Sequence, residues 1–362
     1  MEESTKELRL ISDTPDLDVT HLMADLARAL VGTGPALGFG EVKTLHVPRN
    51  LALVIATSGS TGNPKEVGFS AAALLASAAA SNKNLGARNG QVWSLLLPLT
   101  HVAGSNVLVR SLELGTLPID LRNADRYPKA DFTAIVPTQL FRALNGDTKL
   151  LEHLQNCKKI LVGGAALTTN QADDAAAQGL AIVPTYGMTE TSGGCVYDGY
   201  PLEGVQLRIE DSVIQIKGPT LATTYLNKVA SWEKSFHDGW FVTNDLGEYR
   251  SGKLHVLGRS DDVIITGGEK VSLRSVEDAL TEKFPKTEFS AFVIGDEEWG
   301  DALHIAVSAT SSPTDEEIAT HIKMYLGHTA GPKGILRVEN LPRTELGKVD
   351  KLALQSIVRT RK

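Results

Sequence analysis

A nine-residue stretch rich in glycine, serine and threonine constrains this chain more than any other. It follows the apolar run 51–56, precedes an alanine-rich segment at 69–81 that predicts a helix, and reads Thr57-Ser58-Gly59-Ser60-Thr61-Gly62-Asn63-Pro64-Lys65. Its two glycines let the backbone turn so that successive N–H groups can surround an anion, while Lys65 offsets negative charge. The stretch therefore predicts a loop that binds a triphosphate.

The spacing within this loop disfavours the commonest phosphate-binding motif. That motif, G-x-x-x-x-G-K-[ST], has a lysine directly after its second glycine. Here only two residues separate Gly59 from Gly62, and an Asn-Pro pair stands before Lys65. The stretch instead resembles the T-S-G-[ST]-T-G-x-P-K signature of adenylate-forming enzymes, the superfamily of acyl-CoA synthetases, firefly luciferase and peptide-synthetase adenylation domains. It departs at Glu66, where that superfamily usually has glycine.

A second motif carries the same resemblance. It follows the predicted strand 180–184, reads Y-G-M-T-E-T from Tyr186 onward, and matches the family's Y-G-x-T-E signature. The resemblance implies that Tyr186 stacks on adenine, that Thr189 contacts the α-phosphate, and that Glu190 binds Mg²⁺. This cation prefers carboxylate and phosphate oxygens, which agrees with that assignment.

Glycines and one histidine mark the expected acyl pocket. Small residues at 163–166 correspond to a family segment that lies against the adenine and the acyl group, where missing side chains permit close approach. Residues 98–104 resemble the family's P-x-x-H-x-x-G stretch, so His101 is expected to line or gate the carboxylate site, although a lone histidine is often a structural group. The expected pocket residues are His101, Gly163, Gly164, Ser192, Gly193 and Gly194.

Two later motifs are assigned by resemblance to the ribose and to CoA. Residues 243–247 match T-[GN]-D-L-G, in which Asp245 offers two acceptor oxygens to the two ribose hydroxyls. A run from Gly258 matches G-R-x-D-D-x-I-x-x-G-G, which implies that Arg259 also reaches the ribose and that Asp261 is a hinge. The expected CoA contacts are Gly267 and Gly268. The expected nucleotide contacts are Thr57, Ser58, Gly59, Ser60, Thr61, Gly62, Lys65, Gly164, Ala165, Tyr186, Gly187, Met188, Asp245 and Arg259.

Near its C-terminus the chain carries a motif that supplies the expected catalytic cation. Residues 342–351 read P-R-T-E-L-G-K-V-D-K and match the family's P-R-T-x-x-G-K-x-x-K pattern. From a mobile loop, the Lys348 ammonium can stabilise the charge that develops on the α-phosphate and on the attacking carboxylate oxygen. Six motifs in the family's order carry the resemblance. The expected catalytic residues are Lys348, Thr189, Glu190 and His101, with Glu190 as the metal ligand.

Composition limits the alternatives. With 362 residues and 42% hydrophobic content, the chain can bury a large core, and we expect more than one domain. A formal net charge of −7 offers no basic surface for nucleic acid. Because no long apolar run or apolar leader occurs, we expect a cytoplasmic protein without a membrane span. The cysteines and histidines show no metal-ligand spacing, so any metal is expected to arrive with the nucleotide.

Alternating apolar runs and helix-like segments predict an α/β fold. Between residues 51 and 184 this alternation indicates mainly parallel sheets covered by helices, whereas residues 205–257 are typical of a small antiparallel subdomain. The last hundred residues indicate a compact α+β module. We expect an N-terminal adenylate-forming domain at 1–258, shortened at its N-terminus, and a mobile C-terminal domain at 259–362.

Within the superfamily, the chain looks most like the short actinobacterial o-succinylbenzoate-CoA ligases of menaquinone biosynthesis. Residues 189–205 follow T-E-T-x-G-G-C-V-Y-D-G-x-P-L-x-G-V, and residues 32–37 read G-T-G-P-A-L. The resemblance implies that a carboxylic acid, ATP and CoA, with Mg²⁺, yield acyl-CoA, AMP and pyrophosphate through an acyl-adenylate. The expected partners are these small molecules. Whether the chain forms a homo-oligomer is left open.

Three other interpretations stay open. A ligase for another acyl or aryl acid would share every motif and differ only in its pocket residues. A stand-alone adenylation enzyme that loads a carrier protein would contain the same nucleotide site. A catalytically silent nucleotide sensor, the non-enzyme alternative, would be expected to lack Lys348 or Glu190, and both are present.

Two local expectations concern charge near the ligands. We expect the Glu66 side chain to face solvent, because a carboxylate that pointed toward a triphosphate would repel it. No arginine occurs in the loops 163–166 and 192–194. We therefore expect hydroxyls, backbone N–H groups, water or His101 to bind the carboxylate of the substrate that does not react.

Overall fold

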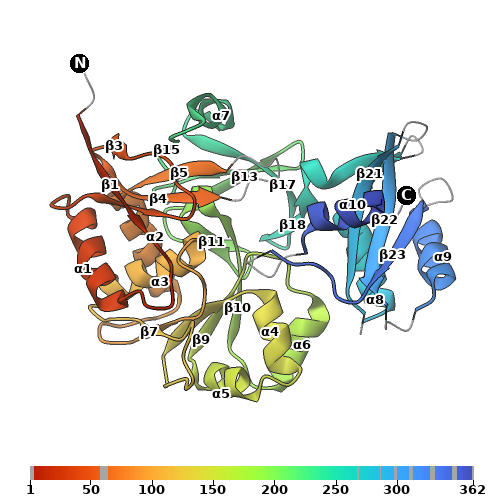
Figure 1. Ribbon diagram of the computed structural model, residues 1–362, viewed down its shortest axis with the longest axis horizontal. Coiled ribbons are helices and arrows are strands. Elements are labelled where there is room, and N and C mark those ends of the chain that lie inside the picture. Colours follow the sequence, from red (N-terminus) through yellow and green to blue (C-terminus); the bar gives the residue numbers. More distant parts are fainter. Residues whose placement is uncertain are drawn as a thin grey trace. The chain divides into compact units, whose positions relative to one another are not determined.

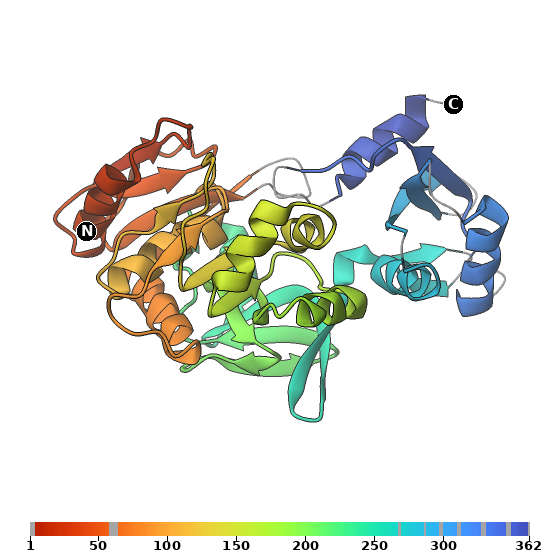
Figure 2. The ribbon, with the colours of Figure 1, turned by 90° about the horizontal axis from the view of Figure 1, so that it is seen from below.

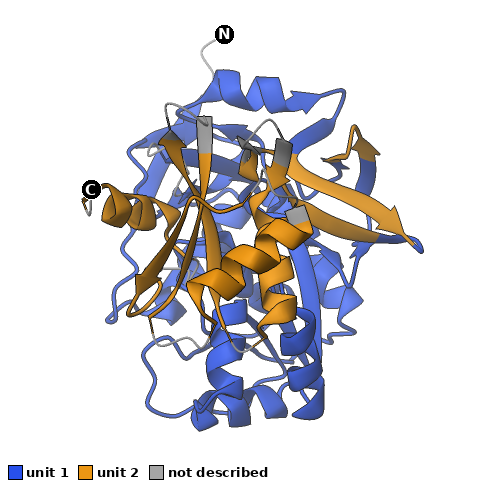
Figure 3. Cartoon of the chain, turned by 90° about the vertical axis from the view of Figure 1, so that its right-hand side faces the viewer, with its two compact units in different colours: residues 1–208, 215–243, 251–253 blue, residues 209–214, 244–250, 254–362 orange. Residues whose placement is uncertain are grey.

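The chain folds into two compact units, which Figure 3 shows in different colours. The computed structural model describes residues 4–57, 64–266, 269–285, 287–296, 300–309, 313–326, 331–344 and 349–360. Unit 1 comprises residues 1–208, 215–243 and 251–253, and unit 2 comprises 209–214, 244–250 and 254–362. The expected domain boundary at residue 258 remains a proposal, since the units do not divide at a single point.

Six strands form the first sheet of unit 1, in the order β15-β5-β4-β2-β1-β3. Strands β1, β2 and β4 run parallel, whereas β5 is antiparallel to both β4 and β15. The expected phosphate loop therefore connects two antiparallel strands, and the helix expected at 69–81 begins only after β5. The strands are β1 Thr5–Ile11, β2 Ala36–Phe39, β3 His46–Pro48, β4 Leu51–Thr57, β5 Lys65–Ser70 and β15 Thr224–Tyr225.

Seven strands form the second sheet of unit 1, in the order β12-β11-β10-β9-β8-β6-β7. Strands β6, β7, β8, β9 and β10 are parallel, as the alternating sequence pattern predicts. Strands β11 and β12 add an antiparallel edge. The strands are β6 Trp93–Leu95, β7 Ile119–Asp120, β8 Phe132–Ile135, β9 Lys159–Val162, β10 Ile182–Met188, β11 Gly193–Tyr197 and β12 Tyr200–Pro201.

Three helices form a layer between these two sheets (Figure 1). Helix α2 contacts β4 and β5 of the first sheet and β11 of the second, and α3 contacts β6, β8 and β11. The helices of the layer are α1 Val19–Leu30, α2 Ala71–Asn84 and α3 Val102–Glu113. Because apolar surfaces cover both faces of this layer, most residues of α3 from Val102 to Ser111 are buried.

Three more helices cover the other face of the second sheet, and Figure 2 shows them from below in yellow and green. They are α4 Pro137–Leu144, α5 Thr148–Asn156 and α6 Thr169–Ala177. Leu140, Leu154 and Ala175 pack there against Ile160 and Val162 of β9. No helix in the described part of the chain combines the length and the hydropathy that crossing a bilayer requires.

The third sheet is built from residues of both units. Its order is β13-β14-β17-β16, with β18 beside β17, and four of its strands contain residues of both units. Its first two strands lie within the segment 205–257, for which a small subdomain of strands is expected. The elements are β13 Gln206–Glu210, β14 Val213–Lys217, α7 Val229–Ser235, β16 Phe236–His237, β17 Trp240–Arg250 and β18 Lys253–Arg259.

Unit 2 contains the fourth sheet, in the order β20-β19-β22-β21 with β23 beside β22. Alternate residues of β22 face two cores: Leu303 and Ile305 pack with α8 and α9, and Ala306 packs with α10. The α+β module predicted from the sequence is therefore present. Its elements are β19 Val263–Thr266, β20 Glu269–Ser272, α8 Leu273–Lys283, β21 Phe289–Asp296, β22 Gly300–Ser308, α9 Asp315–Leu326, β23 Gly334–Val338 and α10 Lys351–Thr360.

Candidate active site

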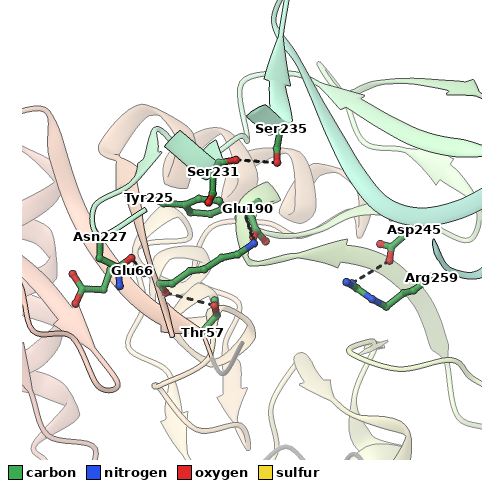
Figure 4. A network of polar contacts seen from close by, with 10 residues as sticks. Thr57, Glu66, Glu190, Tyr225, Asn227, Ser231, Ser235, Asp245 and Arg259 are labelled. Atoms are coloured by element: carbon green, nitrogen blue, oxygen red, sulfur yellow. Dashed lines mark hydrogen bonds and ion pairs between the residues drawn. The ribbon is translucent and has the colours of Figure 1, made fainter. Parts of the chain in front are cut away.

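A cation and a carboxylate from two different motifs meet in unit 1. The Lys65 Nζ atom lies 3.7 Å from Glu190 Oε1. Tyr225 lies against both: its hydroxyl donates to Glu190 Oε1 at 2.5 Å and accepts a hydrogen bond from Lys65 Nζ at 3.2 Å. Figure 4 shows Tyr225 beside Glu190. The structure thus brings together the lysine that ends the phosphate loop and the expected metal ligand, which are 125 residues apart in the sequence.

The environment of Tyr225 keeps its hydroxyl protonated. The side chain is 1% exposed, and burial together with the adjacent Glu190 carboxylate raises the pKa of Tyr225 well above its usual value. At neutral pH the hydroxyl is therefore protonated and acts as a hydrogen-bond donor. An ionised carboxylate is the acceptor that such a donor binds most strongly.

A tight turn after β10 holds Glu190. The residues from Thr189 to Thr191 form one turn of 3₁₀ helix, and Ser192 follows with a left-handed φ of 53°. The buried Thr191 hydroxyl donates to the Gly193 carbonyl at 2.6 Å and accepts from the Met188 N–H at 2.9 Å. Glycine is required at position 187, because a Cβ there would lie 2.1 Å from the Gly193 carbonyl oxygen. Part of the Y-G-x-T-E pattern therefore serves the shape of this turn.

The described ends of the phosphate loop close a hairpin. Thr57 and Lys65 are paired across β4 and β5, and the Thr57 hydroxyl donates to the Lys65 carbonyl at 3.5 Å. The expected nucleotide contacts Ser58, Gly59, Ser60, Thr61 and Gly62 lie outside the described residues.

Glu66 is buried, so the expectation that it faces solvent is wrong. Its side chain is 2% exposed, and its carboxylate accepts hydrogen bonds from the Lys43 N–H, at 2.7 Å, and from the Thr44 hydroxyl. Successive residues of a strand point to opposite faces, so Glu66 points away from the face on which Lys65 meets Glu190. The loop that follows β2 covers this carboxylate and satisfies it.

His101 precedes α3, in a loop that other residues fix. The Asp13 carboxylate accepts from the Leu99 N–H at 2.7 Å and pairs with Arg122, whose guanidinium also binds Asp120. A Cβ at position 104 would lie 2.1 Å from the Pro98 carbonyl oxygen, which explains the glycine of the P-x-x-H-x-x-G pattern. The His101 side chain is half-buried. Its role in catalysis stays a prediction.

The glycines expected in the acyl pocket are sites of close packing. A Cβ at Gly163 would lie 2.2 Å from Thr185 Oγ1, and one at Gly193 would lie 2.7 Å from Asn106 Nδ2. Ser192 is fully buried, and its hydroxyl donates to the Thr220 carbonyl at 2.7 Å. The Ser192 hydroxyl thus holds the segment around Thr220 in place. Gly164 and Ala165 lie exposed after β9, and Gly194 lies beside Tyr197.

Arg110 was missed by the sequence analysis. It is 3% exposed, on α3, and its Nη2 donates to the Tyr197 hydroxyl at 3.4 Å while its guanidinium lies 5.1 Å from the centre of the Trp93 ring. No carboxylate forms an ion pair with it among the described residues, and its Nε has no hydrogen-bond partner there. An arginine in the otherwise apolar segment V-L-V-R was the available signal, because buried arginines are rarely left without an anion.

Two expected ribose ligands meet in unit 2. Arg259 Nη1 lies 3.5 Å from Asp245 Oδ1, and Asp245 is the more buried of the two (Figure 4). Asp261 lies in the short helix Ser260–Asp262 that follows β18. The expected CoA contacts Gly267 and Gly268 and the expected catalytic Lys348 lie outside the described residues. No group of three potential metal-binding side chains occurs in the part that the structure describes.

A family model described as AMP-binding enzyme matches residues 3–228. The chain belongs to this AMP-binding family. The match covers both sheets of unit 1 and includes Lys65, Glu190 and Tyr225. It agrees with the resemblance that the motifs indicate.

Known relatives of this AMP-binding chain extend the match into unit 2. A protein of Mycobacterium tuberculosis named probable 2-succinylbenzoate–CoA ligase is 38% identical over 365 residues, which cover 92% of this chain and 94% of the relative. The ATP-bound crystal structure of MatB from Rhodopseudomonas palustris has a TM-score of 0.75 at 25% identity and covers 85% of this chain and 68% of its own. These similarities confirm the expected superfamily.

A second solved structure supports the fold. The Bacillus subtilis o-succinylbenzoate CoA synthetase MenE, in complex with the acyl-adenylate intermediate OSB-AMP, has a TM-score of 0.74 at 23% identity. The match covers 96% of this chain and 83% of that one. The predicted α/β fold class of this AMP-binding chain is confirmed. The contacts assigned to individual site residues remain proposals.

Replacing Glu66 with alanine should lower stability. The Lys43 N–H and the Thr44 hydroxyl would lose their charged acceptor, and a hydrogen bond to a charged group contributes about 1.5–3 kcal/mol. Chemical denaturation of the variant should show this loss in the free energy of unfolding. Glu41→Ala, at an exposed position of the same loop, is the control and should change that free energy by less than about 0.5 kcal/mol. Equal stabilities of the two variants would contradict the assigned role.

Proposed function

We propose that this chain is an ATP-dependent 2-succinylbenzoate–CoA ligase of menaquinone biosynthesis. The contact between Lys65 and Glu190 supports the binding of ATP, because a triphosphate with its metal needs both a cation and a carboxylate. The acid is inferred from the mycobacterial relative, which bears that name and aligns with nearly the whole chain.

The residues of the two nucleotide motifs suit a metal–ATP complex. Lys65 would offset phosphate charge, the Thr189 hydroxyl would contact the α-phosphate, and Glu190 would bind Mg²⁺. When bound, this ion would neutralise part of the phosphate charge. Tyr186 is assigned to the adenine, and Asp245 and Arg259 are assigned to the ribose hydroxyls.

The reaction would proceed in two half-reactions. In the first, a carboxylate oxygen of the acid attacks the α-phosphorus of ATP, and pyrophosphate leaves. Lys348 would stabilise the negative charge that develops there. In the second, the C-terminal domain would turn about Asp261, and the CoA thiolate would attack the acyl carbon while AMP leaves. Gly267 and Gly268 are assigned to the CoA contacts in this second step.

Arg110 is the group we assign to the second carboxylate of the acid. Its guanidinium has five N–H donors and is buried, so an anion that reaches it meets little competition from water. Asn106, one helical turn earlier on the same face of α3, donates to the Ser192 carbonyl of the expected acyl loop. Arg110 therefore lies on the side of α3 that adjoins this loop. This assignment replaces the hydroxyls and His101 as the main donors.

A pyrophosphate-release assay with a panel of acids tests the proposed function. With CoA present, 2-succinylbenzoate should be turned over at least about tenfold faster, in kcat/KM, than benzoate or a simple fatty acid, because buried donors reject an analogue that cannot pair with them. AMP formation should depend on CoA. Pyrophosphate release with another acid alone would contradict the choice of substrate, and no release with any acid would contradict the ligase activity.

Arg110→Met should affect one substrate selectively. For 2-succinylbenzoate, kcat/KM should fall about tenfold or more, which corresponds to about 1.4 kcal/mol. For 4-oxo-4-phenylbutanoate, which lacks the ring carboxylate, it should change less than threefold. An equal loss for both acids would indicate that Arg110 serves only packing. A thermal melt of each variant controls for stability.

Lys348→Ala should separate the two half-reactions. Adenylate formation should fall at least about a hundredfold, because one preorganised charge at the reacting phosphate is lost. Thioester formation from supplied acyl-adenylate should be largely unchanged. Lys83→Ala, at an exposed surface ion pair, is the control and should alter neither rate. Equal losses in both half-reactions would contradict the role given to Lys348.

A further inference from the structure

The segment 220–227 connects the two nucleotide motifs, although it contains neither. Its Thr223 N–H donates to the Gly68 carbonyl of β5 at 2.8 Å, and its Ala222 N–H donates to the Glu190 carbonyl at 2.8 Å. Asn227 continues the connection, since its Nδ2 donates to the Pro64 carbonyl at 2.9 Å. One short segment therefore bonds to the backbone beside the phosphate loop and to the backbone of the expected metal ligand.

Tyr225 adds a side-chain connection between the same two motifs. Its ring packs edge-on against Trp232, with 5.2 Å between the ring centres, and its backbone pairs with Val67 of β5. Both ends of the side chain are thus fixed. The hydroxyl reaches Lys65 and Glu190 from a rigid position, whereas the two charged side chains can each adopt several rotamers.

We infer that Tyr225 is a positioning residue of the nucleotide site: its hydroxyl holds the Glu190 carboxylate in place beside Lys65. This inference rests on the proposed nucleotide function. Lys65 and Glu190 form an ion pair at 3.7 Å, and the Tyr225 hydroxyl bonds to both groups. Without the hydroxyl, the Glu190 carboxylate would lose its shortest hydrogen bond and could turn to other rotamers, which would weaken its binding of the metal that accompanies a triphosphate.

Tyr225→Phe tests the inference, because phenylalanine keeps the ring against Trp232 and removes only the hydroxyl. Calorimetric titration of the full chain with ATP, once with saturating Mg²⁺ and once with EDTA, measures the effect without any acid or CoA. With Mg²⁺ the Kd should rise at least about fivefold, whereas with EDTA it should change less than twofold. Tyr127→Phe removes a hydroxyl from unit 1 away from both motifs, and neither Kd should change.

A double-mutant comparison sharpens the test. If Tyr225 acts by holding the carboxylate, Glu190→Gln should remove most of the Mg²⁺ dependence, and adding Tyr225→Phe to it should then change the Kd little. Unchanged ATP binding by Tyr225→Phe, or equal losses with Mg²⁺ and with EDTA, would overturn the positioning role. Failure of the unsubstituted chain to bind ATP would contradict the nucleotide function itself, which is a different outcome.

Discussion

The antiparallel pairing of β5 with β15 is the constraint on which the candidate site depends. β15 pairs Tyr225 with Val67 of β5, and β4 pairs Thr57 with Lys65, so backbone pairing fixes both the tyrosine and the lysine. The first sheet contributes the cation and the second sheet contributes Glu190. Because the segment around β15 bonds to both, the two sheets meet at this point through hydrogen bonds as well as through the helices between them.

The layer of helices between the sheets limits where a charged side chain can lie. Helix α3 is buried on nearly all sides, which leaves little room for a charged side chain unless a ligand supplies the counter-charge. Arg110 occupies such a position. Beside Asn106 of the same helix, a Cβ at Gly193 would collide with the amide, and a Cβ at Gly187 would collide with the Gly193 carbonyl. These close approaches leave no room for side chains at Gly187 and Gly193.

The sequence predicted the features that depend on short stretches. The alternating strands and helices follow from local spacing, and the structure contains them, whereas residues 58–63 of the glycine-rich loop lie outside the described part. Glu66 was assigned wrongly, because its environment comes from a loop more than twenty residues earlier that covers it. Tyr225 was overlooked for a similar reason: a single tyrosine shows no pattern until pairing brings it to Lys65. The sequence therefore predicted secondary structure better than it predicted contacts between residues that are far apart along the chain.

Asp13, near the start of the chain, forms hydrogen bonds with a loop that is distant in the sequence. It lies between β1 and α1, outside all six motifs, and yet it caps the Leu99 N–H and binds Arg122. The segment between β1 and α1 thus holds the loop that carries His101 in place through hydrogen bonds. A fusion partner or a trimmed terminus that displaced Asp13 would leave the Leu99 N–H without its acceptor and Arg122 with Asp120 alone among the described residues, and the loop that carries His101 would lose its link to the start of the chain.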